Sequence, residues 1–152
     1  MTHRSWILLS GFLWMAIGSF LLYKGLHFIA DGTLRTDSLC FRLQGLFGGV
    51  QQAGAGLIGV GLLVGFIKGR FVLSKTVKKI ALRIQSFSQP IRVTSIYGPS
   101  YWILIAGMIG FGILLRFLPI PIDLRGVIDT AVGSALIHGA MLYFRTARTI
   151  SS

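Results

Sequence analysis

Four long apolar runs constrain this chain more than any other feature. Ser5 to Tyr23, Leu43 to Ile67 and Val93 to Leu115 contain no Asp, Glu, Lys or Arg over 19, 25 and 23 residues. A fourth run, Gly126 to Phe144, is interrupted by one Asp and one His. A helix needs about 20 mainly apolar residues to cross the hydrocarbon core, and a backbone in lipid must satisfy its own hydrogen bonds. The sequence therefore predicts an all-α integral membrane protein with four transmembrane helices.

The four runs form two helical hairpins around a basic middle segment. In the first hairpin, residues 1–67, the spans are expected at about 5–23 and 43–67. In the second, residues 93–152, they are expected at about 98–117 and 126–144. Residues 5–22 align with 101–118, and 49–70 align more weakly with 126–147. Because each unit has two spans, both would have the same orientation, as a parallel repeat.

The middle segment, residues 68–92, carries seven of the fifteen Lys and Arg residues. Its apolar residues from Leu73 to Phe87 recur in steps of three and four, which predicts an amphipathic helix. Gly69 is expected to separate this helix from the preceding span, and Ser74 to cap its start. Such a helix lies in the membrane interface with its basic residues toward anionic head groups; docking of an acidic partner is the alternative. The expected lipid contacts are Lys75, Lys78, Lys79 and Arg83.

The distribution of basic residues predicts the orientation. If both termini and residues 68–92 share one side, that side holds ten Lys and Arg and the other holds five. The excess favours a cytoplasmic location for both termini, in a membrane of the bacterial inner-membrane type. The basic residues lie at span ends and are not interleaved with aromatic residues, so nucleic-acid binding is not expected.

Small residues at every fourth position predict close helix contacts. This spacing lets helix backbones approach in lipid, so the second and fourth spans are expected to be inner helices or an oligomer contact. The expected packing residues are Gly61, Gly65, Gly69, Ala131, Ala135 and Gly139.

The connections between the spans carry weaker signals. Ser38, with Asp37, is expected to cap a short helix that leads into the second span. The segment from Leu118 to Ile122 contains two prolines and predicts a stiff turn. The lone Cys40 has no intrachain disulfide partner and is expected to be a small buried residue.

Polar residues at the ends of the spans suggest an outer cluster. Asp129 follows Arg125 by one turn, so the two are expected to form an ion pair, and a polar vestibule is the alternative. The residues of this predicted outer cluster are Gln52, Arg116, Asp123, Arg125 and Asp129.

A second polar set lies deeper in the fourth span. Thr130, Ser134 and His138 share one helix face and form a polar stripe, which would line a pathway, relay a proton or bond to a neighbouring helix. Catalytic motifs are absent from the sequence, and with no Glu, one Cys and three dispersed His a metal site or cofactor is not expected.

These features leave three classes of function open. An accessory or scaffolding component of a membrane complex or lipid interface is favoured, because few ionisable groups lie inside the spans. A small-solute or ion transporter or channel subunit that uses the polar stripe is the alternative, and a membrane enzyme is a distant third. The expected partners are anionic lipids and either a homo-oligomer or a larger membrane complex.

Overall fold

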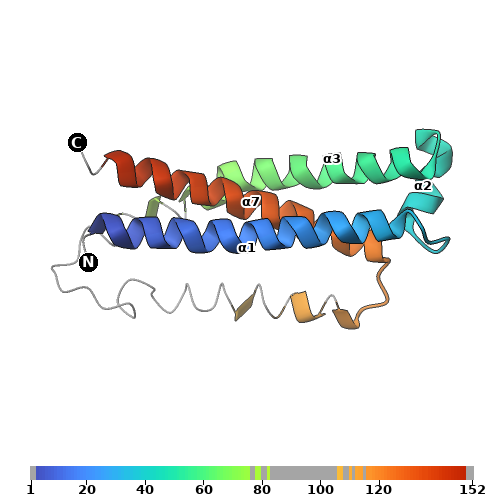
Figure 1. Ribbon diagram of the computed structural model, residues 1–152, viewed down its shortest axis with the longest axis horizontal. Coiled ribbons are helices and arrows are strands. Elements are labelled where there is room, and N and C mark those ends of the chain that lie inside the picture. Colours follow the sequence, from blue (N-terminus) through green and yellow to red (C-terminus); the bar gives the residue numbers. More distant parts are fainter. Residues whose placement is uncertain are drawn as a thin grey trace.

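The computed structural model describes residues 3–75, 78–79, 82, 106–107, 110, 112–114 and 116–149 (Figure 1). These residues are helical apart from short connections. The elements are α1 (His3–Gly32), α2 (Leu39–Phe47), α3 (Val50–Lys68), the π-helical turn η1 (Gly69–Leu73) and α7 (Ile122–Thr149).

Three of these helical stretches are long and apolar enough to cross a membrane: Ser5–Gly32, Val50–Phe71 and Ile122–Thr149. The prediction of a helical membrane protein is confirmed at this level. The predicted third span, about 98–117, lies mostly outside the described residues, so a fourth span stays a prediction.

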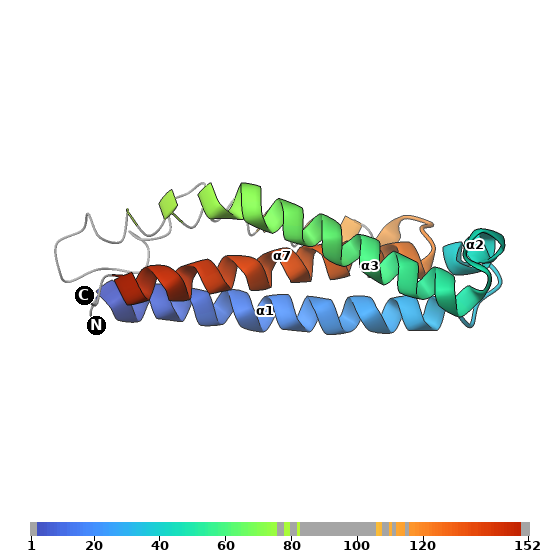
Figure 2. The same ribbon diagram turned by 90° about the horizontal axis from the view of Figure 1, so that it is seen from above.

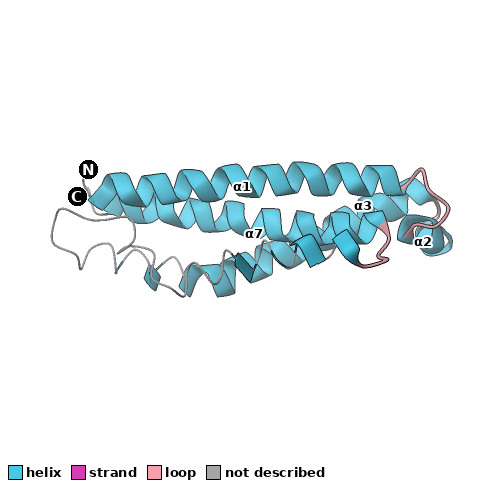
Figure 3. Ribbon diagram, turned by 90° about the horizontal axis from the view of Figure 1, so that it is seen from below, coloured by secondary structure: helices cyan, strands magenta, loops and turns pink. Residues whose placement is uncertain are grey.

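α7 lies between α1 and α3 (Figures 1 and 2). It runs antiparallel to α1 and parallel to α3, so both chain termini lie at one end of the molecule, here called the termini end. The loops around α2 gather at the other end, the α2 end (Figure 3). α7 thus separates the two arms of the predicted first hairpin over most of their length. The alignment partner of the first span, 101–118, is largely outside the described residues, and the repeat stays a prediction.

Glycines at every seventh position bring α1 against α7. Two helical turns separate such positions, so they lie on one face of α1. A methyl group added at Gly18 would lie 2.9 Å from the carbonyl oxygen of Gly133, and one added at Gly25 would lie 2.7 Å from that of Gly126. The two backbones therefore touch directly. The glycines of this α1 face are Gly11, Gly18, Gly25 and Gly32.

Larger side chains fill the α1–α7 contact toward the termini end. Tyr143 and Ile7 are fully buried there, and the ring of Trp14 packs edge-on against Tyr143 with 5.6 Å between centroids. Apolar burial and close backbone contact thus hold the same pair of helices.

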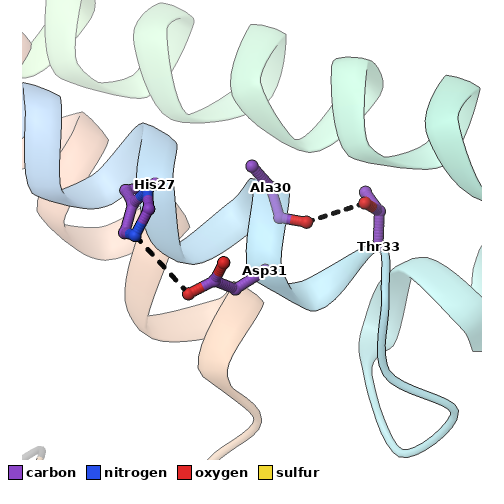
Figure 4. A network of polar contacts seen from close by, with 4 residues as sticks. All are labelled: His27, Ala30, Asp31 and Thr33. Carbon is purple, nitrogen blue, oxygen red and sulfur yellow. Dashed lines mark hydrogen bonds and ion pairs between the residues drawn. The ribbon is translucent and has the colours of Figure 1, made fainter.

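α1 extends nine residues beyond the predicted end at Tyr23, so that boundary is wrong. Charge alone does not end a helix, since the side chains of Lys24 and Asp31 find partners along the helix surface. His27 Nε2 lies 3.8 Å from Asp31 Oδ2 on the next turn (Figure 4). The helix stops at Gly32, and Thr33 Oγ1 donates to the carbonyl oxygen of Ala30.

The second predicted span, 43–67, begins too early, whereas its predicted end lies within one residue of the end of α3 at Lys68. Its first residues belong to α2, which Ser38 caps by accepting a hydrogen bond from the Phe41 N–H. α2 ends at Gly48, whose φ of 82° favours glycine, and α3 begins two residues later. The expected cap at Ser38 is confirmed.

Gly69 does not interrupt the helix, contrary to the prediction. Its backbone is right-handed helical, and its N–H donates to the carbonyls of Gly65 and Phe66. The helix continues through η1, and Ser74 Oγ bonds back to Phe71 within it, so Ser74 is not a helix start. Glycine is tolerated here because a close neighbour needs the space, as described below. Most of the predicted amphipathic segment beyond Lys75, including Arg83, lies outside the described residues.

The fourth predicted span, 126–144, is the core of α7, which extends further at both ends. Leu118 to Pro121 is non-helical and precedes α7, so the prolines lie in a connection.

Candidate functional site: two basic cavities at the α2 end

The predicted outer cluster is divided among three places. Arg116, Arg125 and Asp129 lie together around one cavity. Asp123 is fully buried and lies directly against Gly32: a methyl group added at Gly32 would be 2.6 Å from the Cβ atom of Asp123. Gln52 is exposed in the first turn of α3.

The larger of two described cavities, about 500 Å³, lies between α2 and the segment before α7; we call it the α2 cavity. Three arginines and one aspartate line it, so its ionised side chains sum to 3 − 1 = +2. The N-cap of α2, Ser38, also lines it, as does the start of α7. The lining residues are Arg35, Asp37, Ser38, Arg42, Pro119, Ile120, Pro121, Ile122 and Arg125.

Arg125 holds the connection before α7 in place. Its Nη2 donates to the carbonyl oxygen of Leu118 at 2.8 Å and lies 3.4 Å from that of Arg116. Its Nε is buried and without a hydrogen-bond partner among the described residues. The predicted ion pair with Asp129 is therefore wrong, because both side chains have other partners.

Asp129 pairs with Lys24 of α1 instead, with 3.1 Å between Oδ2 and Nζ. Lys24 Nζ also lies 5.1 Å from the centroid of the Phe28 ring, a cation–π arrangement. This pair borders a second cavity of about 480 Å³, the Lys24 cavity. Its lining residues are Leu21, Lys24, Phe28, Gly112, Ile113, Arg116, Arg125 and Asp129.

Asp123 joins the starts of two helices. Its Oδ2 accepts the backbone N–H of Cys40 at 2.7 Å, and its Oδ1 accepts the N–H of Leu124 at 3.0 Å. A carboxylate at two helix N-termini is favourable because both dipoles are positive there. Cys40 is buried, as expected, and burial, with a hydrogen bond to Asp123 and the charge of that carboxylate, raises the pKa of its thiol to about 11.

The polar stripe of the fourth span faces α3. A methyl group at Gly61 would lie 3.2 Å from Cγ2 of Thr130, one at Gly65 would lie 2.8 Å from Cβ of Ser134, and one at Gly69 would lie 3.1 Å from Cβ of His138. The His138 ring packs edge-on against Phe66. Neither described cavity is lined by the stripe.

The predicted packing glycines of α3 therefore meet α7 through the polar stripe and the alanines beside it. Gly65 lies against the carbonyl of Ala131, and Gly69 against Ala135. Gly139 is buried one turn further along α7. Thr130 is fully buried between Gly25 and Gly61, and its hydroxyl has no hydrogen-bond partner among the residues that the structure describes.

The described lysines of the predicted lipid-contact set, Lys75, Lys78 and Lys79, are exposed and helical. Because α3 runs parallel to α7 with Gly69 beside His138, Lys75 lies at about the depth of Arg145. All four acidic residues of the chain lie toward the α2 end: Asp31 at the end of α1, Asp37 before α2, Asp123 at the start of α7, and Asp129 two turns later beside Lys24. Toward the termini end, the charged residues that the structure describes between Lys68 and Lys79 are all basic, as are Arg145 and Arg148.

In the described part of the chain, no three His, Cys, Asp or Glu side chains are grouped to hold a metal ion. Comparison with protein-family models, curated proteins and solved structures gives no match.

The residues that sequence reasoning missed are Lys24, Arg35, Asp37, Ser38 and Arg42 as cavity walls. The seven-residue spacing of the glycines in α1 matches that of Gly126 and Gly133 in α7, and this match could have predicted that the two helices pack against each other. Pairing Gly25 with Gly126 across antiparallel helices places Lys24 near Asp129.

Proposed function

We propose that this protein is an accessory membrane protein that organises anionic lipid on one side of the bilayer. The carrying observation is the separation of charge along the bundle. Every acidic side chain lies toward the α2 end, while the described charges of the termini end are all basic. A cluster of exposed lysines beside a span attracts anionic head groups by about 1 kcal/mol per residue.

Packing supports the same proposal. Glycines of α1 and α3 make close contacts with α7, so the three helices are tightly packed. Lys75, Lys78 and Lys79 are exposed at the end of this bundle that follows α3. Exposed apolar side chains along the three candidate spans, such as Phe12, Phe20 and Leu63, suit contact with lipid tails. The termini end is assigned to the cytoplasmic leaflet by its excess of basic residues.

The test reconstitutes the protein in nanodiscs that contain phosphatidylglycerol and a neutral lipid. Native mass spectrometry then measures how much phosphatidylglycerol stays bound when the protein is released from the nanodisc. Replacing Lys75, Lys78 and Lys79 together with Gln removes about 3 kcal/mol of attraction, so retention should fall by roughly a hundredfold in binding constant. The matched control replaces the same three lysines with Arg, which keeps the charge, and should retain wild-type lipid. Equal retention by the Gln variant would refute the proposal.

A transporter or channel subunit is the second candidate, favoured by the Lys24–Asp129 pair beside a cavity of about 480 Å³. Ionisable groups within membrane spans commonly mark solute or proton pathways. The test is flux in proteoliposomes with His138→Ala and Asp129→Asn. Loss of flux with intact assembly supports this candidate, and the absence of flux from the wild type for every ion tried counts against it.

A further inference from the structure

The α2 cavity has the chemistry of an anion site, at the end of the molecule opposite the proposed lipid-binding lysines. Arg35 and Arg42 are exposed, so their guanidinium groups reach solvent, while Arg125 is held by the Leu118 carbonyl. The three arginines outnumber the one aspartate of the lining, Asp37. Such a set attracts anions and repels cations.

The arginines are the available donors of this cavity. Ser38 and Ile122, at the starts of α2 and α7, lie in its wall, and the positive end of each helix dipole is at its start. The N–H groups of Cys40 and Leu124 are already bonded to Asp123.

Guanidinium groups bind phosphate through paired N–H donors, and several of them around one cavity favour an anion with several oxygens. Four further lining residues, Pro119 to Ile122, are apolar and would accommodate the carbon portion of an ester. We propose that the α2 cavity binds a phosphate group, carried by a lipid head group or free in solution. This site goes beyond the proposed lipid contacts of Lys75, Lys78 and Lys79 and uses none of those residues.

The experiment measures binding of inorganic phosphate by calorimetry in neutral detergent. It also measures binding of phosphatidylglycerol in nanodiscs by native mass spectrometry, with Lys75, Lys78 and Lys79 replaced by Gln so that the lysine contacts do not contribute. The double variant Arg35→Gln/Arg42→Gln should weaken binding of the effective probe at least tenfold. Arg148→Gln, the same kind of change at the termini end, should leave it unchanged. Binding of phosphate identifies a soluble anion as the ligand, and binding of the lipid alone identifies a head group.

A gain-of-binding variant guards against misfolding. Asp37→Asn removes the one negative charge of the lining and should tighten binding several-fold, which a damaged fold would not do. The triple Gln variant of Lys75, Lys78 and Lys79 should keep the arginine-dependent binding, so this site and the proposed function fail separately. If neither probe binds, or if both bind Arg35→Gln/Arg42→Gln as well as wild type, the proposal is wrong.

Discussion

Nζ of Lys24 lies 3.1 Å from Oδ2 of Asp129 and joins α1 to α7 within their candidate spans. The side chain of Asp129 is 16 % exposed and that of Lys24 is 42 % exposed, so the carboxylate depends on its partner more than the ammonium does. An ion pair so placed fixes the register of two helices that otherwise touch through glycine.

Removing the lysine alone should lower the stability of the protein more than removing both members of the pair. Lys24→Met leaves a shielded carboxylate unpaired and should lower the free energy of unfolding by about 2 kcal/mol, whereas the double variant Lys24→Met/Asp129→Asn should recover about 1 kcal/mol of that loss. Thermal unfolding in dodecylmaltoside measures both. The pair of His27 and Asp31, more exposed and 3.8 Å apart, provides the matched cycle and should show coupling near zero. Equal coupling energies in the two cycles would contradict the conclusion that Lys24 and Asp129 stabilise the contact between α1 and α7.

Close backbone contact makes Gly18 and Gly133 intolerant of a side chain. Alanine at either position meets backbone atoms of the other helix at 2.9 Å or less and should destabilise the protein by about 1–3 kcal/mol. Gly59 has nothing within 4 Å of an added methyl group, so Gly59→Ala serves as the control and should change stability by less than about 0.5 kcal/mol. A neutral Gly18→Ala, measured by the same unfolding assay, would show that α1 and α7 are further apart.

The sequence predicts the elements of this fold better than their ends. Long apolar runs with little or no charge locate α1, α3 and α7, because lipid requires length and hydrophobicity. The rule misplaces the end of α1 at Tyr23, since Lys24 extends to Asp129 and the helix continues. It also misses the break at Gly48. Glycine is common within membrane spans, so the hydropathy of the run does not reveal that this residue has a left-handed backbone.

The candidate site was harder to predict because its walls come from separate elements. Arg125 and Asp129 are one turn apart, which suggested a local pair, but the Leu118 carbonyl and Lys24 compete for them. Local spacing gives no information on these distant partners. The spacing of Gly61 and Gly65 predicted that they share one face, since small residues at every fourth position lie on the same side of a helix, and the structure shows that this face meets α7.

The thiol of Cys40 should react slowly in the native protein. Its pKa is raised to about 11 from 9.0, so at pH 8 the reactive thiolate is roughly a hundredfold rarer than in the unfolded chain. Labelling by a thiol reagent at pH 8 should therefore be slow and become fast in denaturant. Burial is the largest cause of this shift, and Asp123→Asn removes only the contribution of the carboxylate, so the variant should speed labelling in part.

The same shift predicts the direction of a pH effect on stability. The unfolded thiol loses its proton near pH 9, while the folded thiol keeps it to about pH 11, so this contribution is present below pH 9 and is lost as the pH rises to 11. Cys40→Ser should flatten that decline. An unchanged decline in Cys40→Ser would assign it to other groups.

The hydroxyl of Thr130 is fully buried and has no hydrogen-bond partner in the described part of the chain, so its removal should not weaken the fold. Thr130→Val keeps the shape and deletes an unsatisfied polar group, and should leave stability unchanged or raise it by about 1 kcal/mol. Ser134→Ala, beside Gly65, is the neighbouring control. A loss of more than about 1 kcal/mol in Thr130→Val would mean that the hydroxyl has a partner in the membrane.

Side-specific labelling tests the central claim that a basic termini end and an acid-containing α2 end lie on opposite sides of a membrane. In a Cys40→Ser background, single cysteines replace the exposed Thr36 at the α2 end and the exposed Arg148 at the termini end. An impermeant maleimide added to intact cells should label Thr36→Cys directly and Arg148→Cys only after the membrane is opened. Labelling of both positions from the same side would contradict the account.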